Sequence, residues 1–137
     1  MSFKVDSRIE RSSFWLKDWP LSSLYLKNEA NFPWIILVPR ENDVQEICQL
    51  PEKDRDQLMK EISLLSQRMK DFFKPYKLNI GALGNIVPQL HVHVVARFQD
   101  DKLWPHSIWQ PDISTLAYSS EYAAKLVSDL KKVLEYR

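Results

Sequence analysis

Apolar residues recur at helical spacing in two stretches of the chain. Between residues 51 and 73 they fall at steps of three and four, with charged and amide side chains between them, at Leu58, Ile62, Leu65, Met69 and Phe72. This spacing predicts an amphipathic helix. A second helix is predicted over residues 120–136, with Ser119 or Ser120 as its cap. Its inward-facing stripe would consist of Tyr122, Leu126, Leu130, Val133 and Leu134.

Shorter apolar runs, bounded by Asn, Pro and Gly residues, are typical of β-strands. They predict strands at residues 21–27, 34–38, 78–83 and 90–97. The stretch around Phe14-Trp15-Leu16 has mixed periodicity and predicts either a short helix or an edge strand. The order of these elements favours an α+β layer fold, in which an antiparallel sheet is covered on one face by helices.

Length and composition narrow the possible functions. The 137 residues, 45% of them hydrophobic, suit a single domain over 1–137 with one core. Basic and acidic residues balance at 19 and 18, so no basic stripe indicates a nucleic-acid partner. No apolar run is long enough for a membrane span, and no signal-peptide pattern is present, so we expect a cytoplasmic protein. The single cysteine, Cys48, is expected to be an ordinary buried or half-buried thiol.

The segment Gln89-Leu90-His91-Val92-His93 carries the strongest chemical signal. In a strand, Gln89, His91 and His93 would share one face, while the apolar residues between them face the core. Two imidazoles side by side are hard to explain as packing, because each buried ring needs partners for its nitrogens. One ring could attack phosphorus while the other stabilises the oxygens. A metal pair is the alternative, with His106, Asp100 or Asp101 as the third ligand.

Several neighbouring residues allow both a functional and a structural interpretation. Gly84 permits close backbone approach to a ligand at a loop that also carries Asn85, although such a pair is often only a turn. For Trp34 we favour core packing over stacking on a nucleobase. Arg97 could hold a phosphate or be an exposed strand-end arginine. The aromatic segment from Trp104 to Trp109 could be an interface, a nucleobase wall or an ordered tail.

The segment from Gly84 to Val95 resembles the signature of the histidine triad (HIT) family, in which three histidines alternate with apolar residues. Here Gln89 stands in place of the first histidine. The run Phe32-Pro33-Trp34-Ile35-Ile36-Leu37-Val38-Pro39-Arg40 resembles the early hairpin of that family, and Trp104-Pro105 is similar to a Trp-Pro pair that follows the triad. The chain is most similar to bacterial members with Gln-x-His-x-His.

This resemblance implies an antiparallel sheet of about five strands with one long helix and a C-terminal helix, in a homodimer that joins two sheets. It implies a small-molecule nucleotide as substrate, and no cofactor or metal. His91 would be the nucleophile on the α-phosphorus of a dinucleoside polyphosphate or nucleoside phosphoramidate, assisted by His93 and Gln89. The nucleotide and its phosphates would be bound by Asn28, Asn79, Gly84 and Asn85, and Trp104 would approach a neighbouring subunit's site.

Two departures from the family pattern leave alternatives open. Gln89 can form hydrogen bonds but cannot act as an acid or base, and Trp34 occupies a position where many members have a further histidine. The leading hypothesis is a hydrolase or nucleotidyl transferase. The second is a nucleotide-binding module with little or no turnover, and the third is a metal-dependent hydrolase built on His91 and His93.

Overall fold

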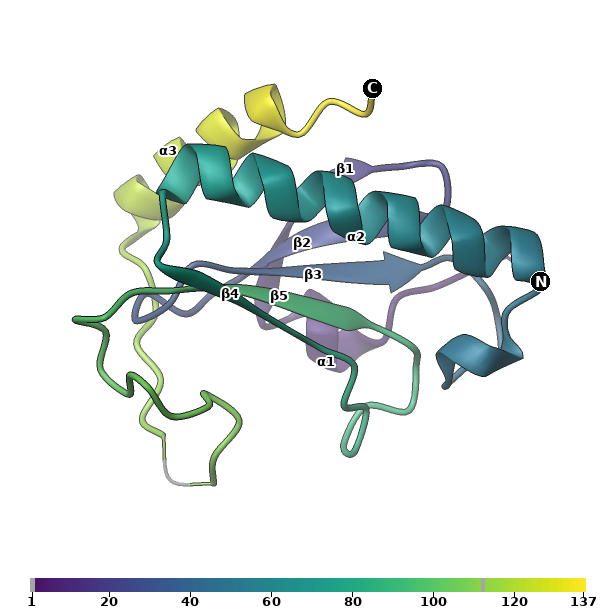
Figure 1. Ribbon diagram of the computed structural model, residues 1–137, viewed down its shortest axis with the longest axis horizontal. Coiled ribbons are helices and arrows are strands. Elements are labelled where there is room, and N and C mark those ends of the chain that lie inside the picture. Colours follow the sequence, from purple (N-terminus) through teal and green to yellow (C-terminus); the bar gives the residue numbers. More distant parts are fainter. Residues whose placement is uncertain (1, 112) are drawn as a thin grey trace.

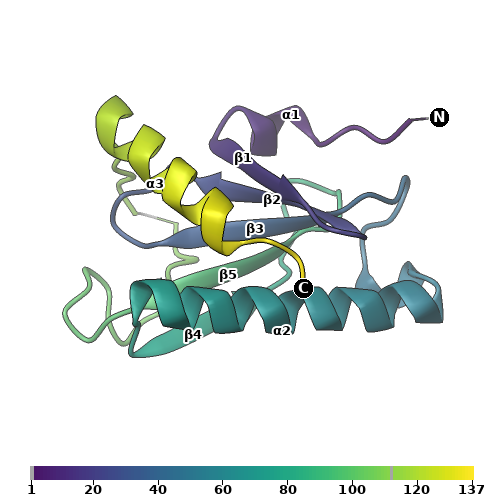
Figure 2. The same cartoon turned by 90° about the horizontal axis from the view of Figure 1, so that it is seen from above.

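The computed structural model describes residues 2–111 and 113–137, and it confirms the α+β class. Five strands form one antiparallel sheet in the order β1-β2-β3-β5-β4. Two longer helices, α2 and α3, lie on one face of this sheet (Figure 1 and, from above, Figure 2). The elements are α1 (Ser7–Glu10), β1 (Ser13–Asp18), β2 (Ser22–Lys27), β3 (Trp34–Pro39), η1 (Ile47–Gln49), α2 (Glu52–Phe73), β4 (Lys77–Gly81), β5 (Val92–Arg97) and α3 (Ser120–Val133).

The main core lies between the sheet and the two helices. The inward-facing residues of the central strands are fully buried there, among them Ile35, Leu37, Val92 and Val94. From α2 the predicted residues Leu58, Ile62, Leu65 and Met69 are buried, and Phe72 packs against them partly buried. The apolar residues that alternate along the strands and those at helical spacing on α2 therefore pack together in one apolar layer.

The C-terminal helix differs from its prediction in extent and in facing. It ends at Val133 and not at residue 136, and its buried residues are Ala123, Leu126 and Leu130. Tyr122 is exposed and stacks on Tyr118 instead. Of the predicted inward stripe, Leu126, Leu130 and Leu134 are buried and Val133 packs partly buried against the core, so the prediction is wrong at Tyr122 alone.

Two other predictions are settled by the fold. Residues 13–18 form the edge strand β1, which is the second of the two alternatives for this stretch. Cys48 is exposed, so the expectation of a buried or half-buried thiol is wrong, because the short η1 that carries it lies outside the core. None of the helices in the described ranges has the length and apolar character that crossing a membrane requires.

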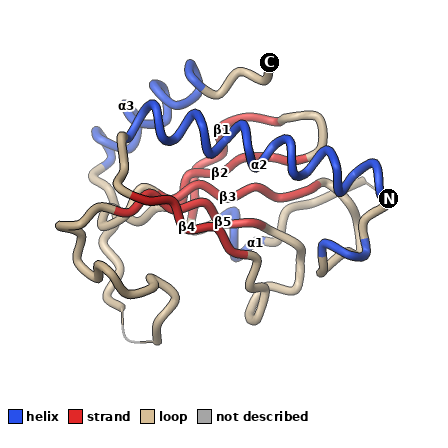
Figure 3. Tube along the Cα trace, in the orientation of Figure 1, coloured by secondary structure: helices blue, strands red, loops and turns tan. Residues whose placement is uncertain are grey.

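The opposite face of the sheet is covered by two separate segments, which Figure 3 draws mostly as loop. The N-terminal segment, with Phe3, Val5 and Ile9, packs on the outward-facing residues Tyr25, Ile36 and Val38. The long loop after β5 packs Ile108 on Phe32 and Val95. The sheet surface between these two covers is the floor of the site described next.

Candidate active site

A cavity of about 440 Å³ opens on the sheet face opposite α2. The loop 83–87 and the loop after β5 contribute its walls, and the ends of β2, β3 and β5 contribute its floor. Its lining comprises Lys27, Glu29, Phe32, Trp34, Leu83, Gly84, Asn85, Ile86, Val87, His91, His93, Ile108, Trp109, Gln110, Ile113 and Thr115. Most of this surface is apolar or aromatic, so the few polar groups stand out.

The two motif histidines meet in this cavity, with their ring centroids 4.8 Å apart. His91 lies directly before β5, and its Nδ1 is 2.7 Å from the backbone carbonyl of Gln89. A carbonyl oxygen only accepts hydrogen bonds, so Nδ1 of His91 carries the proton. The lone pair of its imidazole is therefore on Nε2, the atom that a nucleophile would use.

His93 is held in the complementary tautomer by Trp34. The indole Nε1 of Trp34 donates a hydrogen bond of 2.8 Å to Nδ1 of His93. Because an indole nitrogen only donates, Nδ1 of His93 holds a lone pair, and its proton is on Nε2. Burial lowers the pKa of His93 to about 3, with further contributions from the neighbouring His91 and Lys27. At neutral pH His93 is therefore a neutral hydrogen-bond donor.

Trp34 packs partly buried against two apolar clusters, in line with the expected packing role, and it also lines the cavity. Its side chain is half-buried in the cavity floor, where it contacts His93 edge-on at 5.4 Å between ring centroids. The position of Trp34 in the strand did not predict this contact with His93, because Trp34 begins an apolar run. The signal that could have found it is the family position normally held by a histidine, which also offers a ring N–H.

Gln89 does not point into the cavity, although its carbonyl orients His91. Its side-chain Oε1 accepts a 2.8 Å hydrogen bond from the N–H of Asp6, and its Nε2 donates one of 2.9 Å to the carbonyl of Lys4. The amide thus pairs with the backbone of the N-terminal segment much as a neighbouring strand would. A histidine side chain could not form both bonds in this way, because it lacks a carbonyl oxygen beside its N–H group.

The four predicted nucleotide-binding residues are divided between the cavity and other parts of the fold. Gly84, with a φ of 65°, and Asn85 line the cavity wall. Asn28 lies outside it, and its Oδ1 accepts from the N–H of Tyr118. Asn79 is also outside, since its Oδ1 accepts from Nη1 of Arg97. The structure therefore does not bring Asn28 and Asn79 to the two histidines.

Sequence analysis missed two charged residues that line the cavity. Lys27 is half-buried beneath the cavity, donates to Oγ of Ser12 and lies 5.6 Å from the ring centroid of Trp34. Glu29 is buried, and its Oε2 accepts from the backbone N–H groups of Asn31 and Leu116. Burial lowers the pKa of Lys27, while Glu29 acts to raise it. Nothing in the local sequence distinguished either residue from an ordinary surface charge.

The possible third metal ligands are not assembled around the histidines. Over residues 2–111 and 113–137, no group of three or more His, Cys, Asp or Glu side chains is placed to share a metal ion. Asp101 is instead paired with Arg97, whose side chain is only 1% exposed. Arg97 is thus neither an exposed strand-end residue nor in the cavity.

Comparisons with known proteins agree on one family. The HIT domain profile matches residues 8–100. A histidine triad protein from Bradyrhizobium japonicum is 39% identical, with 98% of this chain and 100% of that chain covered and a TM-score of 0.93. One from Marinobacter aquaeolei VT8 is 35% identical, with 98% and 97% covered and the same TM-score of 0.93. A third, from Sinorhizobium meliloti 1021, is also 35% identical over 96% and 97%, with a TM-score of 0.91. No curated protein matches the chain.

Proposed function

Because this chain belongs to the HIT domain family, we propose that it is a nucleotide hydrolase or nucleotidyl transferase with His91 as its nucleophile. The observation that carries the proposal is the pair of complementary tautomers in one cavity. Nε2 of His91 holds a lone pair, and Nε2 of His93 holds a proton. A phosphoryl group between these rings would meet a nucleophile and a hydrogen-bond donor.

The cavity has suitable surfaces for the parts of a nucleotide. Gly84 and Asn85 line the same cavity as the histidines, and the backbone N–H groups of this loop and the amide of Asn85 would bind phosphate oxygens. The carboxylate of Glu29 can accept hydrogen bonds from the hydroxyls of a ribose. Aromatic and aliphatic walls such as Phe32 and Ile113 suit a planar base.

In the first step, the lone pair on Nε2 of His91 attacks the α-phosphorus of a dinucleoside polyphosphate or a nucleoside phosphoramidate. The P–N bond to His91 forms, and the bond from phosphorus to the leaving oxygen or nitrogen breaks, with its electron pair going to the leaving group. A leaving nitrogen takes a proton from water, so that a phosphoramidate releases ammonia or an amine. The imidazolium that results keeps its Nδ1–H on the carbonyl of Gln89. His93 donates a hydrogen bond to a non-bridging oxygen and does not give up its proton, since losing it would leave an imidazolate.

In the second step, an acceptor attacks the nucleotidyl-His91, and the P–N bond breaks with its electron pair returning to Nε2. If the acceptor is water, its proton passes to solvent and the enzyme is a hydrolase. If the acceptor is another nucleophile, the enzyme is a transferase. Both activities share the covalent intermediate and therefore the same requirement for His91.

A nucleotide-binding module with little turnover is the second candidate, and the low pKa of His93 is the observation that favours it. A neutral His93 cannot protonate a basic leaving group such as an amine. Under this candidate, the wild-type protein binds nucleotides in the cavity without releasing AMP. Turnover in the wild type would rule it out.

The proposed function is tested by the rate of AMP release from adenosine 5′-phosphoramidate and from diadenosine tetraphosphate. We expect His91→Ala to abolish release of AMP while leaving nucleotide binding within about threefold, because His91 contributes the bond-forming atom more than affinity. The same substitution at the exposed His106 is the control and is expected to leave the rate unchanged. Equal rates in wild type and His91→Ala would contradict the proposal.

The homodimer that the resemblance implies would form at an edge of the sheet, and we propose β4 as that edge. Among the described residues, β4 pairs only with β5, so its other side presents backbone groups without a strand partner, and Ile80 is half exposed there. A second copy could extend the sheet across this edge. Sedimentation of the wild type beside Ile80→Lys would test it, with a dimer expected only for the wild type.

A further inference from the structure

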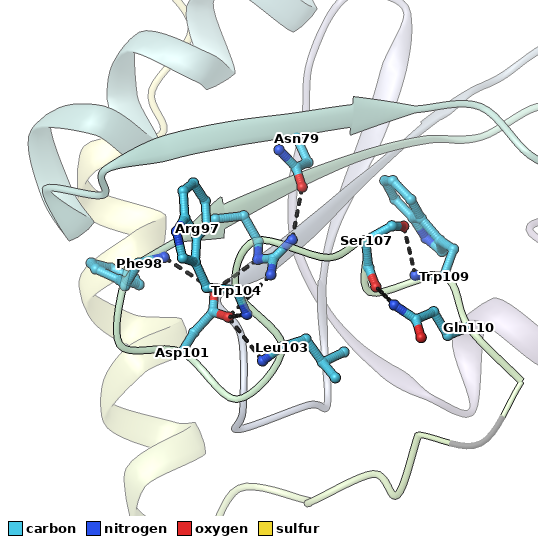
Figure 4. A network of polar contacts seen from close by, with 9 residues as sticks. All are labelled: Asn79, Arg97, Phe98, Asp101, Leu103, Trp104, Ser107, Trp109 and Gln110. Carbon is cyan, nitrogen blue, oxygen red and sulfur yellow. Dashed lines mark hydrogen bonds and ion pairs between the residues drawn. The ribbon is translucent and has the colours of Figure 1, made fainter.

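The loop from Phe98 to Pro111 is fixed to the end of β5 by a buried ion pair (Figure 4). Nε and Nη2 of Arg97 donate to the two carboxylate oxygens of Asp101 at 2.7 and 3.0 Å. The two side chains are only 1% and 4% exposed. The same carboxylate also accepts from three backbone N–H groups of the loop, those of Phe98, Leu103 and Trp104. One side chain thus organises the whole turn.

The guanidinium of Arg97 is committed to protein partners, it is only 1% exposed, and it does not line the cavity. Its Nη1 donates to Oδ1 of Asn79 on β4, and its plane lies between the rings of Phe32 at 5.4 Å and Trp104 at 5.6 Å. A buried arginine on the same strand as His93 would be an obvious phosphate ligand in an enzyme of this kind. Here the side chain is buried outside the cavity and paired with Asp101 and Asn79, so it holds the loop and does not reach a phosphate at the histidines.

The loop carries Trp109 into the wall of the cavity. The ring centroid of Trp109 lies 5.7 Å from that of His93. The six-membered ring rests on Gly81 of β4, the residue paired with His93 in the sheet, and a Cβ built on Gly81 would be 3.1 Å from Cη2 of the indole. A turn at Ser107 supports this placement, because its Oγ accepts from the N–H of Trp109. These contacts therefore fix the position of Trp109 beside the ring of His93.

The two ends of the cavity lie over different strands of the sheet. Lys27 and Glu29 lie at and after the end of β2, whereas Trp109 lies over β4 and β5, and His93 stands between these two ends. The nucleoside that is transferred would occupy the end with Glu29 and Phe32. The group on the other side of the phosphorus, which is the leaving group, would then lie against Trp109.

We propose that Trp109 is a specificity-determining residue that selects leaving groups with a planar, apolar surface, and that Arg97 and Asp101 are positioning residues acting through it. This inference rests on the proposed function. The contact with Gly81 and the buried ion pair of Arg97 and Asp101 hold Trp109 in the cavity wall without a substrate, so no loop closure is needed to form this wall. Contact between two aromatic rings in such a site changes affinity by about twofold to tenfold.

The test compares two substrates that transfer the same adenylyl group to Nε2 of His91. Adenosine 5′-phosphoramidate loses ammonia, which is too small to contact the indole. The 4-nitrophenyl ester of AMP loses 4-nitrophenolate, which takes the electron pair of the broken P–O bond and has a planar ring. The measured quantity is the ratio of kcat/KM for the aryl ester to kcat/KM for the phosphoramidate. A partly unfolded variant lowers both values equally, so the ratio reports the site and not stability.

We expect Trp109→Ala to lower this ratio about fivefold to tenfold, whereas Trp109→Phe keeps it within about twofold because the ring is retained. The indole Nε1 of Trp109 has no hydrogen-bond partner among the described residues, so Trp109→Phe loses no hydrogen bond. Asp101→Asn is expected to lower the ratio in the same direction. In the Trp109→Ala background it should change the ratio no further, since the pair acts through the indole.

Two results would overturn the inference. One is an unchanged ratio in Trp109→Ala, and the other is an equal effect of Asp101→Asn with and without Trp109. If Asp101→Asn does not fold, Asn79→Ala loosens Arg97 more gently and takes its place. If the wild type turns over neither substrate, the proposed function fails separately. The selectivity is then measured as the ratio of the dissociation constants of AMP and its 4-nitrophenyl ester, and a ratio that Trp109→Ala leaves unchanged overturns the inference.

Discussion

Nε1 of Trp34 donates a 2.8 Å hydrogen bond to Nδ1 of His93, and this bond decides which nitrogen of His93 carries a proton. A donor-only indole leaves His93 a single tautomer, with Nε2–H directed away from Trp34. The backbone carbonyl of Gln89 fixes the neighbouring His91 in the other tautomer, with the proton on Nδ1. The site is therefore set up for nucleophilic attack without moving a proton between the two rings.

Trp34→Phe is expected to release His93 from this tautomer. The hydrogen bond stabilises the neutral ring, so its loss should raise the pKa of His93 above about 3, while burial, which is the main cause of the low pKa, keeps it below the ordinary value of about 6.5. Adenylyl transfer should slow by about fivefold, the value of one hydrogen bond of about 1 kcal/mol. Nitrogen NMR of the imidazoles over pH 3 to 8, about the range in which histidines titrate, measures both tautomer and pKa. A His93 signal identical to that of the wild type would contradict this account.

The low pKa of His93 also has a consequence for stability at acid pH. The unfolded chain binds a proton at His93 near pH 6.5, about the model-peptide value, whereas the folded chain does so only near pH 3. Unfolding therefore becomes easier as pH falls through this window. His93→Gln should lose less stability between pH 7 and 4 than the wild type, measured by denaturant titration at each of about four pH values. A parallel pH dependence in both proteins would be evidence against a neutral, buried His93.

Gln89→Ala should detach the N-terminal segment from the site. It removes two hydrogen bonds to the backbone of Lys4 and Asp6, which predicts a loss of about 1 to 3 kcal/mol in the free energy of unfolding. Hydrogen exchange at residues 4–9 should become faster, while α2 remains protected. The substitution keeps the backbone carbonyl of Gln89 that accepts from His91, so kcat and KM should change little. Unaltered exchange at residues 4–9 would show that the amide is not the anchor. Gln67→Ala, an exposed glutamine on α2, is the matched control.

Asp101→Asn should destabilise the fold at neutral pH but not in acid. Burial alone would raise the pKa of Asp101, but hydrogen bonds from Arg97 and from the N–H groups of Phe98 and Leu103 lower it to about 2. The charged pair thus stabilises the protein above about pH 4 and is lost as pH falls toward about 2. We expect a loss of about 3 kcal/mol at pH 7, because one partner of a buried pair is removed.

The control for this substitution is Asp100→Asn at the exposed neighbouring position. Denaturant unfolding at neutral pH should give the same stability for this variant as for the wild type. The difference between Asp101→Asn and the wild type should shrink as the pH is lowered, since both side chains are then neutral. A difference that is independent of pH would mean that the charge on Asp101 is not what stabilises the loop.

Gly81→Ala should displace the indole of Trp109 without removing it. The new Cβ would lie 3.1 Å from Cη2 of Trp109 and 3.2 Å from Cδ1 of Leu83, so both neighbours must yield. We expect a loss of stability of about 1 kcal/mol and a smaller change in leaving-group selectivity than Trp109→Ala causes. Steady-state kinetics with the two adenylyl donors measures the second effect. Selectivity equal to that of the wild type would argue against the contact between Trp109 and Gly81.

The helices, the strands and the histidine pair could be predicted because each depends on local periodicity. The apolar residues of α2 and the alternation around His93 are set by neighbours in the sequence. The partners of Gln89 and Trp34 could not be predicted in the same way, because they lie 83 and 59 residues away along the chain. Gln89 was therefore placed in the catalytic set, whereas its side chain anchors the N-terminal segment.

The same limitation explains the errors at Arg97 and Asn79. Each was considered a ligand of the phosphate from its residue type, yet each has a protein partner that only the folded chain brings close. The role of Trp109 depends on Gly81, and a glycine in a strand gives no indication of which ring rests on it. Long-range polar partners thus decided which of the candidate residues face the cavity.

The central claim is that His91 carries the nucleotide covalently, and the mass of the intact protein tests it most directly. Wild type, His91→Ala and His106→Ala are each mixed briefly with adenosine 5′-phosphoramidate, denatured without acid and weighed. The account predicts one added adenylyl group on the wild type and on His106→Ala, lost on mild acid treatment, and none on His91→Ala. An adduct that persists in His91→Ala, or nucleotide binding by the wild type with neither adduct nor AMP release, would contradict it.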